Sequence, residues 1–184
     1  MRKFAAILAI LLITVSVFAD EYVIDKVHSG ANFSVRHMML SNVHGRFTDV
    51  SGTINYDEKD VTKSSVTAVI KTASISTDNE NRDKDLRSAN FFDTDKFPEA
   101  TFNSTKVEKR GDQLVAIGDF TMHGVKKPIT FTLQGGKTTA QKGSTRIGFY
   151  ASLAVSRKDF GVGGQFGLGD QVQIYIGMEG VKKK

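Results

Sequence analysis

Residues 81–98, NRDKDLRSANFFDTDKFP, separate two runs of segments in which apolar and polar residues alternate. Five of the first seven residues of this stretch are charged, whereas Phe91, Phe92 and Phe97 place three aromatic rings within seven positions. So many charges are incompatible with a core strand, and adjacent phenylalanines are unfavourable in a fully exposed loop. We therefore expect the stretch to cap or line a cavity.

The segments on both sides of this stretch have the pattern of half-buried strands. They are residues 33–37, 43–47, 52–56, 64–76, 100–107, 113–122, 129–133, 145–156 and 172–179. Their connections are short, with expected turns at residues 110–112 and 122–128, which favours antiparallel pairing. Closing about eight strands into a ring removes exposed sheet edges, so we predict an all-β, antiparallel eight-stranded barrel. A β-sandwich is the alternative.

The charged half of residues 81–98 favours a short helix, over about residues 78–88. Either Thr77 or Asp78 has a side chain suited to cap its first turn. Asp83 and Arg87 are separated by four positions, so they would face each other on a helix and could form an ion pair. One short helix inserted into an all-β barrel is therefore expected.

The first nineteen residues have the pattern of a cleaved signal peptide. Arg2 and Lys3 precede an apolar run over residues 4–17, and Ala19 ends a small-x-small cleavage pattern. The apolar run is shorter than the ~20 residues of a membrane span. We expect residues 1–19 to be removed, which leaves residues 20–184 as a single domain. The expected location is the periplasm or the extracellular space, and the mature chain is not expected to be integral to a membrane.

Composition excludes several classes of function. The chain contains no cysteine, so disulfides, thiol catalysis and thiolate metal sites are absent. Loss of Arg2 and Lys3 would lower the formal net charge from +5 to +3. That modest charge, together with export, gives no indication of nucleic-acid binding.

The spacing of the histidines does not indicate a metal or catalytic site. His28, His37, His44 and His123 form neither an H-x-H nor an H-E-x-x-H pattern, and no G-x-S-x-G motif is present. The glycine-rich residues 161–169 contain no lysine, so they are interpreted as a mobile hairpin loop rather than a phosphate-binding loop. No catalytic residue, metal or cofactor is predicted.

Two arginines are candidates for contacts with a polar head group. Arg82 and Arg157 each lie near an acid and aromatic residues. Surface ion pairs are the ordinary interpretation, but an arginine at the mouth of a cavity could bind a phosphate or amide through two parallel hydrogen bonds. Both interpretations stay open for both residues.

Several linked motifs in the same order resemble those of the YceI family, also described as polyisoprenoid-binding and lipocalin-like. The motifs are Asp25-x-x-His28-Ser29-x-x-x-Phe33-x-x-x-His37, Val43-x-Gly45-x-Phe47 with Gly52, Ser65-Val66 with Ile75-x-Thr77, Arg82-Asp83-x-x-Leu86-x-Ser88-x-x-Phe91-Phe92-Asp93 with Phe97-Pro98, residues 118–124, and Arg157-x-Asp159-Phe160-Gly161. The resemblance covers essentially the whole mature chain. Phe120, Met122 and Val125 depart from the family pattern, which affects only packing at that turn.

The resemblance implies an extended eight-stranded barrel that holds a long-chain isoprenoid or fatty-acid-derived lipid, with its head near the mouth. It also implies a periplasmic or secreted, non-enzymatic protein that transports, stores or sequesters the lipid, and a possible homodimer. The candidate ligand-binding residues are Phe33, Val35, His37, Arg82, Leu86, Phe91, Phe92, Phe97, Arg157 and Phe160. An enzyme acting on such lipids and an interaction module with a self-filled barrel are the alternatives.

Overall fold

The computed structural model describes residues 19–141, 143–163 and 167–184. The predicted signal peptide therefore lies outside the described residues, apart from Ala19, as does part of the loop expected at residues 161–169. The strands are β1 (Asp20–Ile24), β2 (Gly30–His37), β3 (Ser41–Phe47), β4 (Val50–Tyr56), β5 (Ser65–Lys71), β6 (Ile75–Ser76), β7 (Glu99–Arg110), β8 (Gln113–Met122), β9 (Val125–Gln141), β10 (Ser144–Ser156) and β11 (Leu168–Lys182). The helices are α1 (Glu80–Arg87) and the 3-10 turns η1 (Val61–Lys63), η2 (Thr72–Ser74) and η3 (Arg157–Phe160).

Eight strands form a closed antiparallel ring. Their order is β1-β4-β5-β7-β8-β9-β10-β11, and β11 pairs again with β1. Tight hairpins join β7 to β8 at the predicted turn around Gly111 and β8 to β9 at His123 and Gly124, and all three residues have positive φ. The second turn is shorter than the predicted residues 122–128, because β9 already begins at Val125. The predicted eight-stranded barrel with one short helix is therefore confirmed, and the sandwich alternative is wrong.

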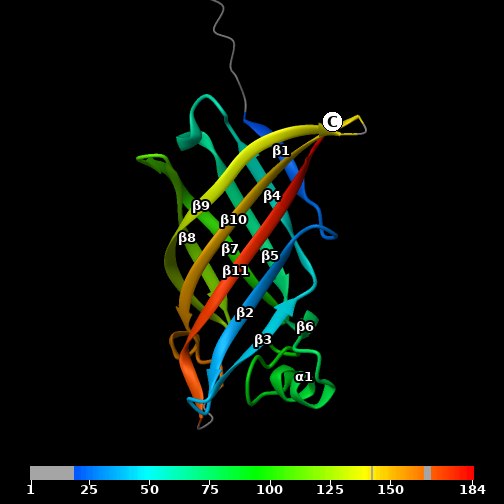
Figure 1. Cartoon of the computed structure of the whole chain (residues 1–184), viewed down its shortest axis with the longest axis vertical. Coiled ribbons are helices and arrows are strands. Elements are labelled where there is room, and N and C mark those ends of the chain that lie inside the picture. Colours follow the sequence, from blue (N-terminus) through cyan, green and yellow to red (C-terminus); the bar gives the residue numbers. More distant parts are fainter. Residues whose placement is uncertain (1–18, 142, 164–166) are drawn as a thin grey trace, which may run out of the picture.

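The strand β11 has two neighbours on the side away from β10. Its upper end pairs with β1 through Gly180, Val181 and Lys182, whereas its lower part, from Leu168 to Gly177, pairs with β2. The strands β2, β3 and β6 thus form a branch that diverges from the ring at its lower end. Figure 1 shows α1 and the segment after it beside this branch, at the end of the barrel opposite the C-terminus.

The alternation predicted from the sequence places apolar side chains inside the barrel. On β10, Ile147, Phe149 and Ala151 are buried, whereas Tyr150 between them is exposed. The same pattern on β8 buries Ala116 and Phe120. The core therefore consists of the inward side chains of all the ring strands, which also form the walls of the interior.

The segment expected to be one strand over residues 64–76 is interrupted. It forms β5, then the turn η2, and then β6, which pairs with β3 instead of β4. Thr72 is buried in the turn, where its hydroxyl donates to the carbonyl of Phe97 and its amide to that of Pro98. These bonds come from a segment distant in sequence, so the alternating pattern alone could not predict the break.

The helix α1 lies within the expected range, but its polar contacts differ from those predicted. Its N-cap is Asn79, whose side chain accepts from the amide of Arg82, rather than Thr77 or Asp78. Asp83 accepts from the amide and hydroxyl of Thr77 instead of pairing with Arg87. The i and i+4 spacing permitted that pair, but the fold supplies Asp83 with a closer, buried partner.

A close backbone approach in β4 yields a test of the barrel wall. A Cβ on Gly52, where φ is +149°, would lie 2.0 Å from the carbonyl oxygen of Thr67 in β5. We expect Gly52→Ala to lower the free energy of unfolding by about 1–3 kcal/mol, as measured by urea denaturation. Gly30→Ala is the matched control, because a Cβ there meets no atom within 4 Å. Equal effects of both substitutions would contradict this explanation.

Candidate ligand-binding cavity

The barrel interior contains two apolar chambers that share part of their walls. The first, at the α1 end, comprises about 890 Å³ of space free of protein atoms, and the second about 1000 Å³, including the parts open to solvent. Five residues line both chambers: Ala31, Ile70, Phe120, Val155 and Ile174. We call these residues the waist. The chambers therefore adjoin each other inside the barrel, and together we call them the bore.

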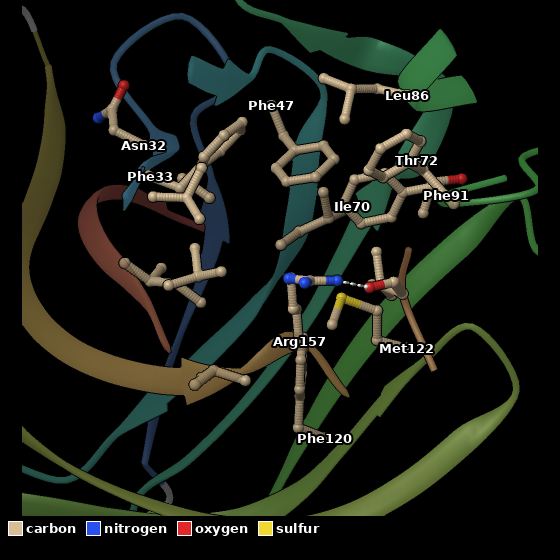
Figure 2. Close-up of a pocket in the computed structure, with 18 of the residues that line it drawn as sticks. Asn32, Phe33, Phe47, Ile70, Thr72, Leu86, Phe91, Phe120, Met122 and Arg157 are labelled. Atoms are coloured by element: carbon tan, nitrogen blue, oxygen red, sulfur yellow. Dashed lines mark hydrogen bonds between the residues drawn. The ribbon is translucent and has the colours of Figure 1, made fainter. Parts of the chain in front are cut away.

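The first chamber is walled mainly by aromatic and branched aliphatic side chains. Figure 2 shows Phe33, Phe47, Phe91 and Leu86 gathered around it, from β2, β3 and the α1 region. The Phe47 ring lies 5.9 Å from the Phe33 ring and 5.6 Å from the Phe92 ring, measured between centroids. The segment after α1 thus completes the wall where the β2, β3 and β6 branch leaves the ring.

Few polar side chains reach the bore. Asn32, Thr72 and Arg157 line the first chamber, and the second has Asn55, Tyr56 and two serines. Burial raises the pKa of the Tyr56 hydroxyl, which keeps it neutral at physiological pH. No carboxylate, lysine or histidine is among the described residues that line either chamber. The bore therefore favours an apolar ligand with little charge along its length.

Six of the ten candidate residues named from the sequence line the first chamber, and four do not. The six are Phe33, Val35, Leu86, Phe91, Phe92 and Arg157. His37 is exposed at the end of β2, and Phe97 packs against His123 with 4.4 Å between ring centroids. Phe160 is buried but does not line either chamber, and the centroid of its ring lies 5.3 Å from that of Phe120. Ligand contact by the six lining residues stays a prediction.

Arg82, one of the candidate ligand-binding residues, does not line either chamber. The residue is exposed on α1, and its guanidinium donates to the hydroxyl and carbonyl oxygens of Thr77, at 2.7 and 2.9 Å. Asp83 accepts from the same threonine. Arg82 and Asp83 therefore attach the start of α1 to the end of β6, which holds the helix against the barrel.

Arg157 lines the cavity, but its hydrogen-bonding capacity is already used. A guanidinium has five N–H donors, and each has an acceptor here. The acceptors are the carbonyl oxygens of Val162, Gly163, Leu168 and Gly169 and the carboxylate of Asp170. Arg157 thus fastens residues 162–163 and 168–170 to the end of β10 and has no free donor for a head group.

Most of the lining residues were not predicted from the sequence. Thirteen positions of the first chamber were not named: Ala31, Asn32, Phe47, Ile70, Thr72, Ala100, Phe120, Met122, Val155, Val162, Leu168, Val172 and Ile174. The strand parity already grouped Phe120 with Met122, so extending the inward face of each strand would have identified many of them. Thr72 has the same parity as Val66, Ala68 and Ile70, whereas Asn32 has the opposite parity to Phe33 and Val35 and gave no such signal.

A charged cluster lies outside the bore, where β1, β10 and β11 meet. Ligand atoms of Asp25, His28 and Glu179 all lie within 4.8 Å of one another, a spacing that a metal ion could bridge. Arg146 Nη1, however, donates to Asp25 Oδ2 at 2.7 Å and to Glu179 Oε2 at 3.2 Å. The guanidinium thus supplies the positive charge of this cluster and opposes the binding of a second cation there.

Together, these features define a class: closed antiparallel barrels with an apolar internal cavity, the architecture of lipocalin-like proteins. Within the described residues, no helix is long and apolar enough to cross a membrane. The YceI-like domain family matches residues 22–180. The chain therefore belongs to the YceI family, as the sequence motifs predicted.

Individual relatives agree with this assignment. Protein YceI of Salmonella newport (strain SL254) is 40% identical over 180 residues, covering 96% of this chain and 94% of that protein. The solved Campylobacter jejuni YCEI protein is 31% identical, with a TM-score of 0.71 over 79% of this chain and 88% of that one.

More distant structures share the fold. Burkholderia cenocepacia BcnA has a TM-score of 0.76 at 22% identity, covering 85% of this chain and 98% of that chain. A domain from Saccharophagus degradans, described as polyisoprenoid binding, has a TM-score of 0.68 at 17% identity over 88% and 98% of the two chains. At these identities the likeness shows the architecture alone.

The cluster around Asp25 predicts a pH-dependent contribution to stability. Hydrogen bonds from His28 and Arg146 hold the pKa of the Asp25 carboxyl well below its usual range. The pKa of Asp25 is thus lower in the folded state than in the unfolded state, where it is near 3.8. Ionised Asp25 therefore stabilises the folded protein at pH values above 3.8, and this stabilisation is lost as the pH falls toward the folded-state pKa. Asp25→Asn should therefore lower the urea midpoint at pH 7, and the difference from wild type should shrink below about pH 4.

Asp112→Asn, in the exposed turn between β7 and β8, is the control for the change in net charge. Its effect on the urea midpoint should be small at every pH. A deficit of Asp25→Asn that is equally large at pH 7 and at pH 3 would show that ionisation of Asp25 is not its cause.

Proposed function

We propose that this protein binds one long-chain isoprenoid or fatty-acyl lipid in its bore and performs no chemistry on it. The observation that carries the proposal is the pair of adjoining apolar chambers, whose walls are almost free of polar side chains. A chain-shaped apolar ligand is the kind that fits two chambers in line. The lipid head would lie at one end of the bore, in contact with water or with the few polar groups there.

The energetics favour long chains. Each buried methylene contributes about 0.8 kcal/mol, whereas association costs on the order of 4–15 kcal/mol in lost freedom of motion. A short chain would bind weakly, because its burial would barely offset that cost. The length of the apolar chain is thus the main determinant of selectivity, and the head group contributes less.

The lining residues also favour binding over catalysis. General acid and base catalysis needs a titratable side chain within hydrogen-bonding distance of the reacting group. The described walls offer Arg157, which has no free donor, and the neutral Tyr56. The Saccharophagus degradans domain of the same fold is described as polyisoprenoid binding, which agrees with a binding role for this architecture.

The proposed setting is the periplasm or the extracellular space, reached through the signal peptide predicted in residues 1–19. Transport, storage and sequestration of the lipid are all compatible with the bore. In any of these roles, burial in the bore keeps the apolar chain of the lipid out of water while the lipid is away from a membrane. In a homodimer, each barrel would bind its own lipid.

Extraction of the purified protein tests the proposal directly. Organic solvent should release a lipid with a long unbranched or isoprenoid chain, identified by mass spectrometry. Calorimetry on the delipidated protein should show affinity rising roughly fourfold per added methylene until the bore is full. An empty extract together with a flat affinity series would support the self-filled barrel, and release of a chemically altered lipid would support the enzyme.

The waist provides a structural control on chain length. Ala31 is buried at the junction of the chambers, so Ala31→Leu should narrow the passage and shorten the longest chain that binds tightly. In a calorimetric chain-length series the plateau in affinity should then occur at a shorter chain. Ala154→Leu is the matched control, because Ala154 is exposed on the outer face of β10. An unchanged plateau in Ala31→Leu would mean that the ligand does not pass the waist.

A further inference from the structure

The turn between β2 and β3 presents an unusual group of exposed apolar side chains. Met38, Met39 and Leu40 are 48%, 78% and 83% exposed, and they are consecutive in sequence. Single exposed hydrophobic residues are common on soluble proteins, but a contiguous group at a protruding tip indicates an interaction surface. We call these three residues the tip.

The backbone at the tip is strained at two positions. Met38 and Met39 have φ values of 50° and 59°, in the left-handed region that hairpin turns usually fill with glycine or asparagine. Methionine in this region is unfavourable by about 1–2 kcal/mol per residue. The turn therefore has two large apolar side chains at positions where small residues would be more stable, and such outliers point to a functional constraint.

Three of the six polar backbone groups of the tip form hydrogen bonds within the protein. The Met38 amide donates to the carbonyl of Gly167 at 2.6 Å, and the Leu40 amide to that of His37 at 3.0 Å. The Met39 carbonyl accepts from Arg36 Nη2 at 2.8 Å. Groups that are already paired lose little on leaving water, so these three hydrogen bonds lower the cost of moving the turn into an apolar environment.

The charge around the tip is one-sided. From Gly30 to Phe47 the β2 and β3 hairpin contains two arginines and two histidines and no acid. Arg46 pairs with Asp78, farther from the turn, whereas Arg36 beside the tip has no carboxylate partner among the described residues. An apolar tip with an adjacent cation matches the boundary of a bilayer that contains anionic lipid.

The tip is also close to the first chamber. Leu168, which lines that chamber, pairs with His37, and Gly167 beside it accepts the hydrogen bond from Met38. Figure 1 shows the β2 and β3 turn at the same end of the barrel as α1, away from the C-terminus. A surface bound at the tip would therefore lie against the end of the bore that α1 covers.

We propose that the tip docks the protein on the surface of a lipid bilayer containing anionic phospholipid. Met39 and Leu40 insert into the interfacial region, and Arg36 contacts the lipid phosphates. Three apolar side chains give weak and reversible binding, as an exchanging lipid carrier requires. This inference rests on the proposed lipid-binding function for its purpose, but the docking itself can be tested separately.

The absence of tryptophan from the chain allows a direct test. Leu40→Trp would place the only indole at the tip, and Val27→Trp is the matched control, since Val27 is 84% exposed in the loop between β1 and β2. On addition of phosphatidylethanolamine vesicles containing phosphatidylglycerol, the emission of Leu40→Trp should shift to shorter wavelength. The emission of Val27→Trp should not change, and phosphatidylcholine vesicles should give a weaker shift at the tip.

A flotation assay with the same vesicles measures the energetic contribution. Leu40→Ser should reduce the vesicle-bound fraction about tenfold, whereas Val27→Ser should leave it unchanged. Both variants should release as much lipid on extraction as the wild type. If Leu40→Ser still contains lipid but does not float with the vesicles, the substitution has removed docking alone. If extraction of the wild-type protein releases no lipid, that result counts against the proposed function and leaves the docking result unaffected.

Three results would overturn the docking proposal. One is equal spectral shifts in Leu40→Trp and Val27→Trp, and another is no shift in either variant. The third is a shift of Leu40→Trp that appears on concentrating the protein without vesicles and accompanies a dimeric mass in sedimentation, because the tip would then be an interface between two copies of the chain.

Discussion

The structure depends on the way β11 divides its free edge between two partners. Its upper end closes the ring through β1, and its lower part carries the branch of β2, β3 and β6. The branch diverges from β4 and β5, and the first chamber lies at this lower end, with α1 and the segment after it completing its wall (Figure 1).

A few buried polar contacts join the segments at this end of the barrel. Thr77 connects Arg82 and Asp83 of α1 to β6, and Arg157 connects the end of β10 to the start of β11. Every buried side-chain nitrogen and oxygen in the described residues has a partner. The charged motifs of the sequence therefore build the frame of the cavity, and the surface that faces a ligand remains apolar. This division explains how a chain with so many charges near its cavity can hold a hydrophobic molecule.

The same end of the barrel combines three features relevant to lipid exchange: the first chamber, the covering helix and the exposed tip of the β2 and β3 hairpin. The proposed binding inside the bore would be driven by removal of apolar surface from water, which is non-directional and needs no specific polar group. Docking at the tip would rely on the same effect at a bilayer surface, assisted by charge. A protein with both properties can take a lipid from a membrane without exposing the chain to water.

The strand parities, the hairpin turns, the position of the short helix and the family could all be predicted from the sequence, since each depends on local spacing or on ordered motifs. Five residues predicted from the sequence to contact a ligand do line the cavity: Phe33, Val35, Leu86, Phe91 and Phe92. The break after β5, the branch at β11 and the contacts of Arg82 and Arg157 could be seen only in the folded protein. The physical reason is that an arginine binds whichever acceptors the folded backbone places within reach, and spacing along the chain does not show that these will be Thr77 for Arg82 or the carbonyls of residues 162–163 and 168–169 for Arg157.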